Sequence, residues 1–118
     1  MAALFIRVRF EPSGQFGPGK AALLEQIAAT GSIRKAAAAM KMSYRRAWLL
    51  SQEIEKLFGA PVIARATGGA KGGGATLTPL GKTLIRRFRN IEKRAANAAK
   101  ADTDALTKLA QRSSATRR

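Results

Sequence analysis

Residues 31–59 read GSIRKAAAAMKMSYRRAWLLSQEIEKLFG, and this stretch decides the fold. It contains two segments with helical spacing, and each segment follows a serine. Ser32 and Ser43 suit the N-cap position, because a serine hydroxyl can accept a hydrogen bond from the free N–H groups of a first helical turn. The stretch therefore predicts helices over residues 33–40 and 44–58, joined by a short turn.

An apolar face runs along both of these helices and along an earlier helix expected over residues 18–29. Gly31 and Gly59 suit the left-handed position that ends a helix. Two short helices joined by a tight turn, with a third before them, form a helix-turn-helix unit. The residues expected to face its core are Leu23, Leu24, Ile27, Ala28, Ala36, Ala37, Met40, Ala47, Leu50, Ser51, Ile54, Leu57 and Phe58.

Two short strands and a glycine-rich loop follow the helices. Residues 62–66 and 75–78 have strand character and flank the loop TGGAKGGG, so we expect a long hairpin, or wing. The alternating apolar residues of Leu4–Phe10 predict a further strand, which the turn-forming sequence EPSG ends.

A long helix is expected after the wing, with Thr78 as its N-cap and Pro79 in its first turn. Its helical spacing extends to about residue 112. So long a helix finds few partners within a small chain, and we therefore expect its apolar stripe to pack against a second copy. The expected interface residues are Leu80, Leu84, Phe88, Ile91 and Ala95.

The charge of the chain favours a polyanionic partner. The 118 residues include 22 Lys and Arg against 7 Asp and Glu, a formal net charge of +15, and nucleic acid is the usual partner of such a chain. There is no Cys or His, which excludes disulfides, Cys/His zinc sites and thiol or imidazole catalysis. Glu25, Glu53 and Glu55 stand at ordinary surface spacings, so we expect no enzyme activity, metal or cofactor. No apolar run reaches the length of a membrane span. The absence of Cys fits a cytosolic protein, and we expect a cytoplasmic, nucleoid-associated one.

The start of the 44–58 helix is the expected DNA contact. The last helix of a helix-turn-helix projects its N-terminal end into the major groove, where Arg can bind guanine or grip phosphate. Trp48 is expected to pack against the first helix or a partner subunit, with a DNA contact as the alternative. The expected DNA-binding residues are Ser32, Arg34, Ser43, Tyr44, Arg45, Arg46, Arg65, Lys71 and Gly72.

These features predict a mainly α fold with small β, a winged helix-turn-helix with a long C-terminal dimerisation helix. Residues 1–78 would form the DNA-binding domain, residues 79–112 the dimerisation helix and residues 113–118 a basic tail. We expect a homodimer that binds double-stranded DNA sequence-specifically. The alternative is a nonspecific architectural DNA-binding protein of nucleoid type, for which the high charge alone would suffice.

The motifs GSI at 31–33, MSY at 42–44 with AW at 47–48, RATGG at 65–69, GGGA at 72–75 and LTPLG at 77–81 occur together in this chain. In combination they resemble the N-terminal DNA-binding domain of ModE-type molybdate-responsive regulators, with a looser similarity to LysR-type domains. The resemblance implies a transcriptional regulator that binds a palindromic operator as a dimer, with residues 43–58 in the major groove and residues 67–75 near the backbone. Because the chain ends near the junction to the molybdate-binding module of that family, we expect a stand-alone form without direct molybdate binding.

Overall fold

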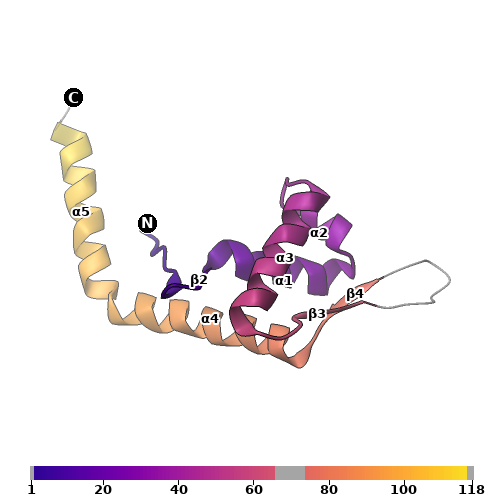
Figure 1. Cartoon of the computed structure of the whole chain (residues 1–118). Coiled ribbons are helices and arrows are strands. Elements are labelled where there is room, and N and C mark those ends of the chain that lie inside the picture. The colour runs from indigo at the N-terminus through magenta and orange to yellow at the C-terminus, as the bar shows by residue number, and fades with distance from the viewer. Residues whose placement is uncertain (1, 66–73, 117–118) are drawn as a thin grey trace.

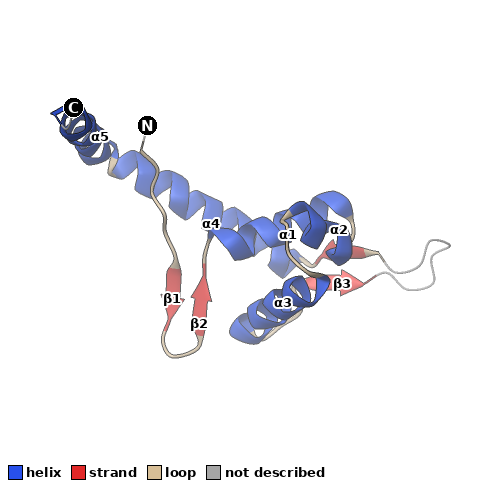
Figure 2. Cartoon of the chain, turned by 90° about the horizontal axis from the view of Figure 1, so that it is seen from above, coloured by secondary structure: helices blue, strands red, loops and turns tan. Residues whose placement is uncertain are grey.

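The computed structural model describes residues 2–65 and 74–116, and the side chains of this range up to residue 112. The described chain is mainly helical, with two separate two-stranded antiparallel sheets (Figures 1 and 2). The elements are β1 (Val8–Phe10), β2 (Gly14–Phe16), α1 (Pro18–Thr30), α2 (Ile33–Ala39), α3 (Tyr44–Phe58), β3 (Ile63–Arg65), β4 (Ala75–Leu77), α4 (Pro79–Ala98) and α5 (Lys100–Thr116). The predicted mainly α fold with small β and a winged helix-turn-helix is confirmed: three helices and a β3–β4 hairpin form its body.

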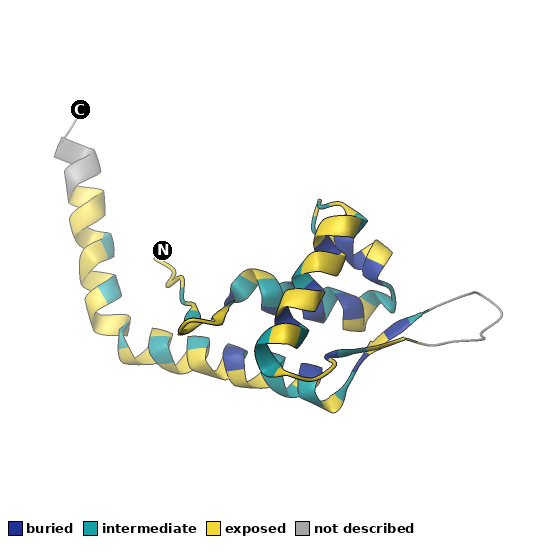
Figure 3. Cartoon of the chain, in the orientation of Figure 1, coloured by how far each residue is buried: buried dark blue, intermediate teal, exposed yellow. Residues whose placement is uncertain are grey.

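The core of this body is built around α1. Leu23, Leu24 and Ile27 of α1 are fully buried, and α2, α3, β4 and α4 all contact this helix. Phe16, at the end of β2, adds an aromatic cluster, with its ring centroid 5.9 Å from that of Phe58 and 5.4 Å from that of Phe88. Figure 3 shows that burial is concentrated in this body, while the described part of α5 is largely exposed.

The N-terminal segment forms a hairpin of which the sequence predicted only one strand. The expected strand over residues 4–10 is shorter in the structure, because only Val8–Phe10 pairs with a neighbour. That neighbour is β2, in the register Val8↔Phe16, Arg9↔Gln15 and Phe10↔Gly14. The pairing places Phe16 in the core, so the hairpin contributes to the body through β2.

The predicted helix ends are confirmed by their backbone geometry. Gly31 and Gly59 follow α1 and α3 with φ values of +72° and +71°, the left-handed conformation that glycine adopts without steric cost. The side chain of Thr78 accepts a hydrogen bond from the N–H of Gly81 at 3.1 Å, and Pro79 occupies the first turn of α4. Local chemistry therefore places the start of α4 directly after the β3–β4 hairpin.

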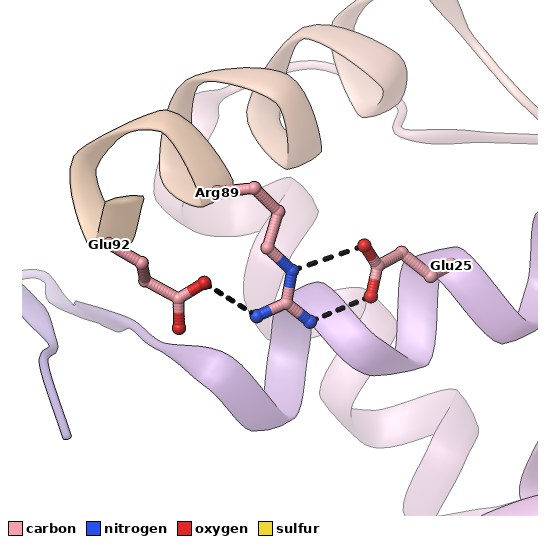
Figure 4. A network of polar contacts seen from close by, with 3 residues as sticks. All are labelled: Glu25, Arg89 and Glu92. Atoms are coloured by element: carbon pink, nitrogen blue, oxygen red, sulfur yellow. Dashed lines mark hydrogen bonds and ion pairs between the residues drawn. The ribbon is translucent and has the colours of Figure 1, made fainter. Parts of the chain in front are cut away.

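Two close contacts hold α4 against the body. At Gly81 the helix passes so near the chain that an added Cβ would lie 2.6 Å from the carbonyl oxygen of Val62. Further along, Arg89 donates to both carboxylate oxygens of Glu25 on α1, at 3.1 and 2.7 Å, and to Glu92 at 2.7 Å (Figure 4). The hydrogen bonds to the two carboxylates, with Glu25 first, raise the pKa of the Arg89 guanidinium above its ordinary value. The network ties α4 to the central helix of the body.

The single long helix expected over residues 79–112 is wrong, because the structure has two helices. α4 ends at Ala98 and α5 begins at Lys100, and α5 turns away steeply from the axis of α4 (Figure 1). Ala99, between them, has φ −94° and ψ 0°, outside the helical region, so the axis bends there. Ala2, Ala3, Leu4 and Ile6 line a depression in the angle between the two helices, together with Thr103 and Thr107. Neither Gly nor Pro marks the bend, so helical spacing alone could not predict it.

The contact at Gly81 makes the replacement of this glycine by alanine a test of the fold. Ala has the better helix propensity by about 1 kcal/mol. We nevertheless expect Gly81→Ala to lower the free energy of unfolding, because overpacking against a rigid backbone oxygen costs about 1–3 kcal/mol. Urea unfolding followed by circular dichroism measures the change.

Gly19 provides the matched control, because it also lies in a helix and an added Cβ would meet nothing within 4 Å. Gly19→Ala should leave the stability unchanged or raise it. A Gly81→Ala variant as stable as the Gly19→Ala variant would contradict the close approach of α4 to the chain at Val62.

Candidate nucleic-acid interface

The face that projects from the body is created by the close crossing of α2 and α3. Ala36 and Ala37 on α2 and Ala47 on α3 are buried, and their small side chains allow the two helices to approach. On the same side of α3, Ile54 is fully buried, and the buried hydroxyl of Ser51 donates to the Trp48 carbonyl at 2.6 Å. α3 therefore packs on the body along one side only, which leaves its opposite side exposed.

The two serines expected to contact DNA cap the helices of this pair. Ser32 Oγ accepts from the N–H of Lys35, and Ser43 Oγ accepts from the N–H of Arg46, each at 3.1 Å. Between the helices, Lys41 has a φ of +58°, an uncommon conformation for a residue other than glycine. The caps and this turn determine where α3 begins and how its first turn emerges. A hydroxyl that accepts a capping bond still holds its own proton as a donor.

The exposed side of α3 carries both a charged and an apolar group of residues. Arg45 is exposed at the start of the helix, as predicted, and Gln52 is exposed two turns later. Between them Trp48 and Leu49 are 38% and 43% exposed. Trp48 is not part of the core cluster, so the predicted packing against the first helix does not bury it. Its packing against a partner subunit stays a prediction. The sequence analysis did not select Leu49 and Gln52 as DNA contacts, although their spacing of four and seven residues from Arg45 places them on its face.

Tyr44 and Arg34 are brought together at the junction of α2 and α3. The Tyr44 ring is half-buried and packs against the core, and the Arg34 guanidinium lies over it, 4.6 Å from its centroid. Only part of Tyr44, an expected DNA contact, is therefore open at the surface. The ring holds a cation next to the first turn of α3, where the electrostatic attraction of a cation to an aromatic face favours this geometry.

Arg46 points along a different flank of α3 from Arg45. It lines a depression of about 420 Å³ together with Met42 of the turn and with Phe5 and Arg7 of the N-terminal segment. Arg7 is exposed, and its guanidinium carbon lies 5.2 Å from the centroid of the Phe5 ring. The structure thus adds Arg7, which the sequence analysis did not select, to the basic residues near the start of α3.

The base of the wing is fixed to α3 by a carboxylate. One oxygen of Glu55 accepts from the backbone N–H groups of Val62 and Ile63, at 2.9 and 3.3 Å, just where β3 begins. β3 pairs with β4 in antiparallel register, which places exposed Arg65 opposite Ala75 at the outer end of the described hairpin. Lys71 and Gly72, the other expected wing contacts, lie outside the described residues. The spacing of Glu55 in the sequence is that of an ordinary surface residue, yet Glu55 positions the wing relative to α3.

The other glutamates of the body also have structural partners. Glu25 pairs with Arg89, and Glu53 lies 3.4 Å from Lys20. Among the described residues no group of three or more carboxylates could hold a metal ion. In the same part of the chain, no helix is long and apolar enough to cross a membrane.

Positive charge is not opposed by any carboxylate on α2 and the first half of α3. Residues 32–52 contain five Lys and Arg side chains and no Asp or Glu. Every one of these five cations is exposed. The interface is therefore a cationic surface at the end of the molecule that also bears the β3–β4 hairpin (Figure 1).

The residues expected at a subunit seam occupy different environments on α4. Phe88 is only 2% exposed and packs on Phe16, so its predicted place in the seam is wrong: its ring is used inside the protomer. Leu80 and Leu84 are half-buried against the same core, and Ala95 is also half-buried. Ile91 is 42% exposed. The apolar stripe of α4 is thus shared between the body and its open surface.

Comparison with known proteins agrees with the observed fold. The crystal structure of the CbnR_DBD–DNA complex is similar with a TM-score of 0.59 and 19% sequence identity, over 75% of this chain and 95% of that chain. At this identity the similarity supports the arrangement of helices and wing and nothing further.

Two relatives are similar over the N-terminal part of the chain. The molybdenum-pterin-binding protein MopB of Rhodobacter capsulatus is 45% identical over 66% of this chain and 29% of its own length. The DNA-binding transcriptional dual regulator ModE of Escherichia coli K12 is 41% identical over 60% of this chain and 27% of its own length. The chain therefore matches less than a third of either relative. These names agree with the resemblance seen in the sequence motifs.

One family model matches more than half of the chain. It covers residues 20–82, from the beginning of α1 through the β3–β4 hairpin to the first turn of α4. Its description is that of a bacterial regulatory helix-turn-helix protein, and such proteins regulate transcription rather than catalyse reactions. The chain therefore belongs to the lysR family of bacterial regulatory helix-turn-helix proteins.

Proposed function

We propose that this protein is a transcriptional regulator that binds double-stranded DNA sequence-specifically as a homodimer. The observation that carries the proposal is the exposed, cationic first half of α3, which projects from the body with Arg45 at its outer side. The family, and the description of the Escherichia coli relative as a DNA-binding transcriptional regulator, support the same function. Such a protein would act on the nucleoid in the cytoplasm.

The major groove is the part of DNA that suits α3. An α-helix fits into this groove, and each base pair presents there a distinct set of donors and acceptors. Arg45 is exposed on the side of α3 opposite its buried face, so its guanidinium is free to approach a guanine edge and donate to O6 and N7. We assign base reading to Arg45 ahead of Arg46, whose flank faces the N-terminal segment.

The remaining basic residues are suited to the phosphates on either side of the groove. Arg34 is held over Tyr44 beside the start of α3, and Arg46 lies on the opposite flank near Arg7. The hydroxyls of the two capping serines can add donors to phosphate oxygens. Arg65 stands on the β3–β4 hairpin, and we propose that the glycine-rich segment beyond it, with Lys71 and Gly72, approaches the backbone as the sequence predicted.

The second half of α4 is the proposed contact between subunits. Ile91 is exposed on this half, and Ala95 follows it by one helical turn. Leu80 and Leu84 could contribute their exposed edges, whereas Phe88 has none to offer. A symmetric pair of α4 helices would give the two copies of α3 a fixed separation. Two-fold symmetry of the protein implies a palindromic operator whose half-sites lie about one helical turn of DNA apart, or a multiple of that distance.

Molybdate is not part of this proposal. The relatives whose names refer to molybdenum or ModE extend far beyond the part that this chain matches. The described residues that we assign to the interface are basic and neutral groups suited to DNA. We propose that these residues bind DNA without a cofactor.

A competition experiment separates specific from nonspecific binding. Selection from random duplexes with the purified protein should enrich one palindromic sequence. In fluorescence anisotropy at fixed salt, that sequence should bind at least about 10³-fold more tightly than random duplex DNA. A ratio near one would instead identify an architectural DNA-binding protein, for which the net charge of +15 would suffice.

Replacing Arg45 tests the assignment of base reading. Arg45→Ala should weaken binding to the enriched site by about 1–3 kcal/mol and relax the preference at one base pair, while binding to random DNA changes little. Lys108→Ala is the matched control, because Lys108 is an exposed cation on α5, away from α3. Equal affinities of the two variants for the enriched site would remove Arg45 from the base-reading residues.

Replacing Ile91 tests the subunit contact without disturbing the core. Ile91→Lys should convert the dimer to a monomer in sedimentation equilibrium, because a charge would then be buried in an apolar seam. Ile91 is exposed in the protomer, so the circular dichroism spectrum should be unchanged. An unaltered dimer mass in the variant would show that α4 does not form the seam at this residue.

A further inference from the structure

We propose that Trp48 and Leu49 form an apolar patch that reads the 5-methyl groups of thymines in the major groove. The inference rests on the proposed binding of DNA by α3 and adds the chemistry of the bases that this helix selects. Arginine alone would account for guanine and phosphate contacts. The apolar patch adds a preference for A·T pairs with thymine at defined positions.

The exposure of these two side chains is the first observation. Trp48, the single tryptophan of the chain, is 38% exposed, and Leu49 beside it is 43% exposed. The other apolar residues of α3, such as Ala47 and Ile54, are buried or packed against the core. Single exposed apolar residues are normal on protein surfaces. Two large neighbours on the outward side of the helix that carries Arg45 leave apolar area exposed to water, and that area would be covered on binding.

Helical geometry places the pair between two polar side chains. Trp48 and Leu49 follow Arg45 by three and four residues and precede Gln52 by four and three, so all four are neighbours on the helix surface. Gln52 follows Arg45 by seven positions, which correspond to about 10 Å along the helix axis. At 3.4 Å per base pair this length corresponds to about three base pairs. Arg45 and Gln52 thus mark the ends of a short reading surface, and the apolar pair occupies its middle.

The chemistry of base edges matches this order of side chains. Thymine is the base that presents a methyl group in the major groove, next to the donor and acceptor of its paired adenine. A glutamine amide suits that adenine edge, and an arginine guanidinium suits guanine. An apolar side chain beside the methyl group excludes water from it. A half-site that combines a guanine with adjacent A·T pairs therefore complements this surface.

The charges around the patch argue for DNA as its occupant. Residues 32–52 contain five basic side chains and no carboxylate, and Lys56 continues the exposed side of α3 beyond Gln52. A second copy of this chain would bring the same positive charges to the contact, and like charges disfavour that pairing. Phosphates on both sides of a major groove would neutralise these charges while the methyl groups cover the apolar pair.

Substitution of thymine by deoxyuridine tests the proposal directly, because it removes the methyl group and preserves base pairing. The probe is the duplex enriched from random sequences with the purified full chain. Each thymine position is replaced in turn, in both half-sites of the same duplex. We expect the affinity to fall about 16-fold at each contacted position, because removing one buried methyl-sized group lowers it about four-fold and each symmetric replacement removes two. Fluorescence anisotropy of the labelled duplexes measures this ratio.

Protein variants identify the reader of each methyl group. Leu49→Ala and Trp48→Ala should each abolish the preference for thymine over deoxyuridine at one position and preserve it at others. Leu106→Ala is the matched control, because Leu106 is 63% exposed on α5 and should leave every ratio unchanged. Circular dichroism and sedimentation of the free variants check their fold and assembly, which should match the parent protein since both side chains are exposed.

The outcomes distinguish this inference from the function on which it rests. If selection enriches no sequence, sequence-specific binding itself fails, and the reading of thymine fails with it. If a sequence is enriched but deoxyuridine is tolerated at every position, only the thymine reading is overturned. It is also overturned if both variants keep the full thymine preference. Loss of the dimer in Leu49→Ala or Trp48→Ala would show that a second copy covers the patch, which contradicts the proposal.

Discussion

The close crossing of α2 and α3 is the constraint on which the rest of the interface depends. Because the crossing is made through Ala36, Ala37 and Ala47, the first turns of α3 pack closely on α2, and Trp48 and Leu49 lie on the outer side of the helix. A larger residue at any of these positions would push the helices apart and tilt α3. The same crossing leaves Trp48 and Leu49 exposed, although large apolar side chains are normally buried inside a domain. One packing choice therefore produces both a rigid reading helix and an exposed apolar patch.

The carboxylates of the body have a positioning role that complements this arrangement. Glu55 links the start of β3 to α3, and Glu25 holds Arg89 and with it α4 against α1. These contacts connect the elements that must keep fixed relative positions if one surface contacts DNA and another contacts a second subunit. Few acids are present, and those of the body are placed where they join elements. The charge of the interface is therefore left uncompensated and available to phosphate.

The structure divides the predicted apolar stripe of α4 between two roles, packing in the core and contact with another molecule. Up to Phe88 the stripe belongs to the core, where ring packing and the close approach at Gly81 hold the helix. After that point the helix leaves the body, and Ile91 begins the part that is open to another molecule. The bend at Ala99 then directs α5 away from the axis of α4. The bend limits how far two α4 helices could run side by side.

The sequence by itself determined the winged helix-turn-helix, because the signals for it are local. Serine, threonine and glycine caps act within one turn of their helix, and spacing along a helix decides which side is apolar. Tertiary structure alone decided which apolar residues are used inside the protomer, such as Phe88, and which remain exposed, such as Trp48. It also decided the pairing of β2 and the bend at Ala99. These features depend on partners distant in sequence or on where a helix leaves the body, and neither leaves a periodic pattern that a sequence can reveal.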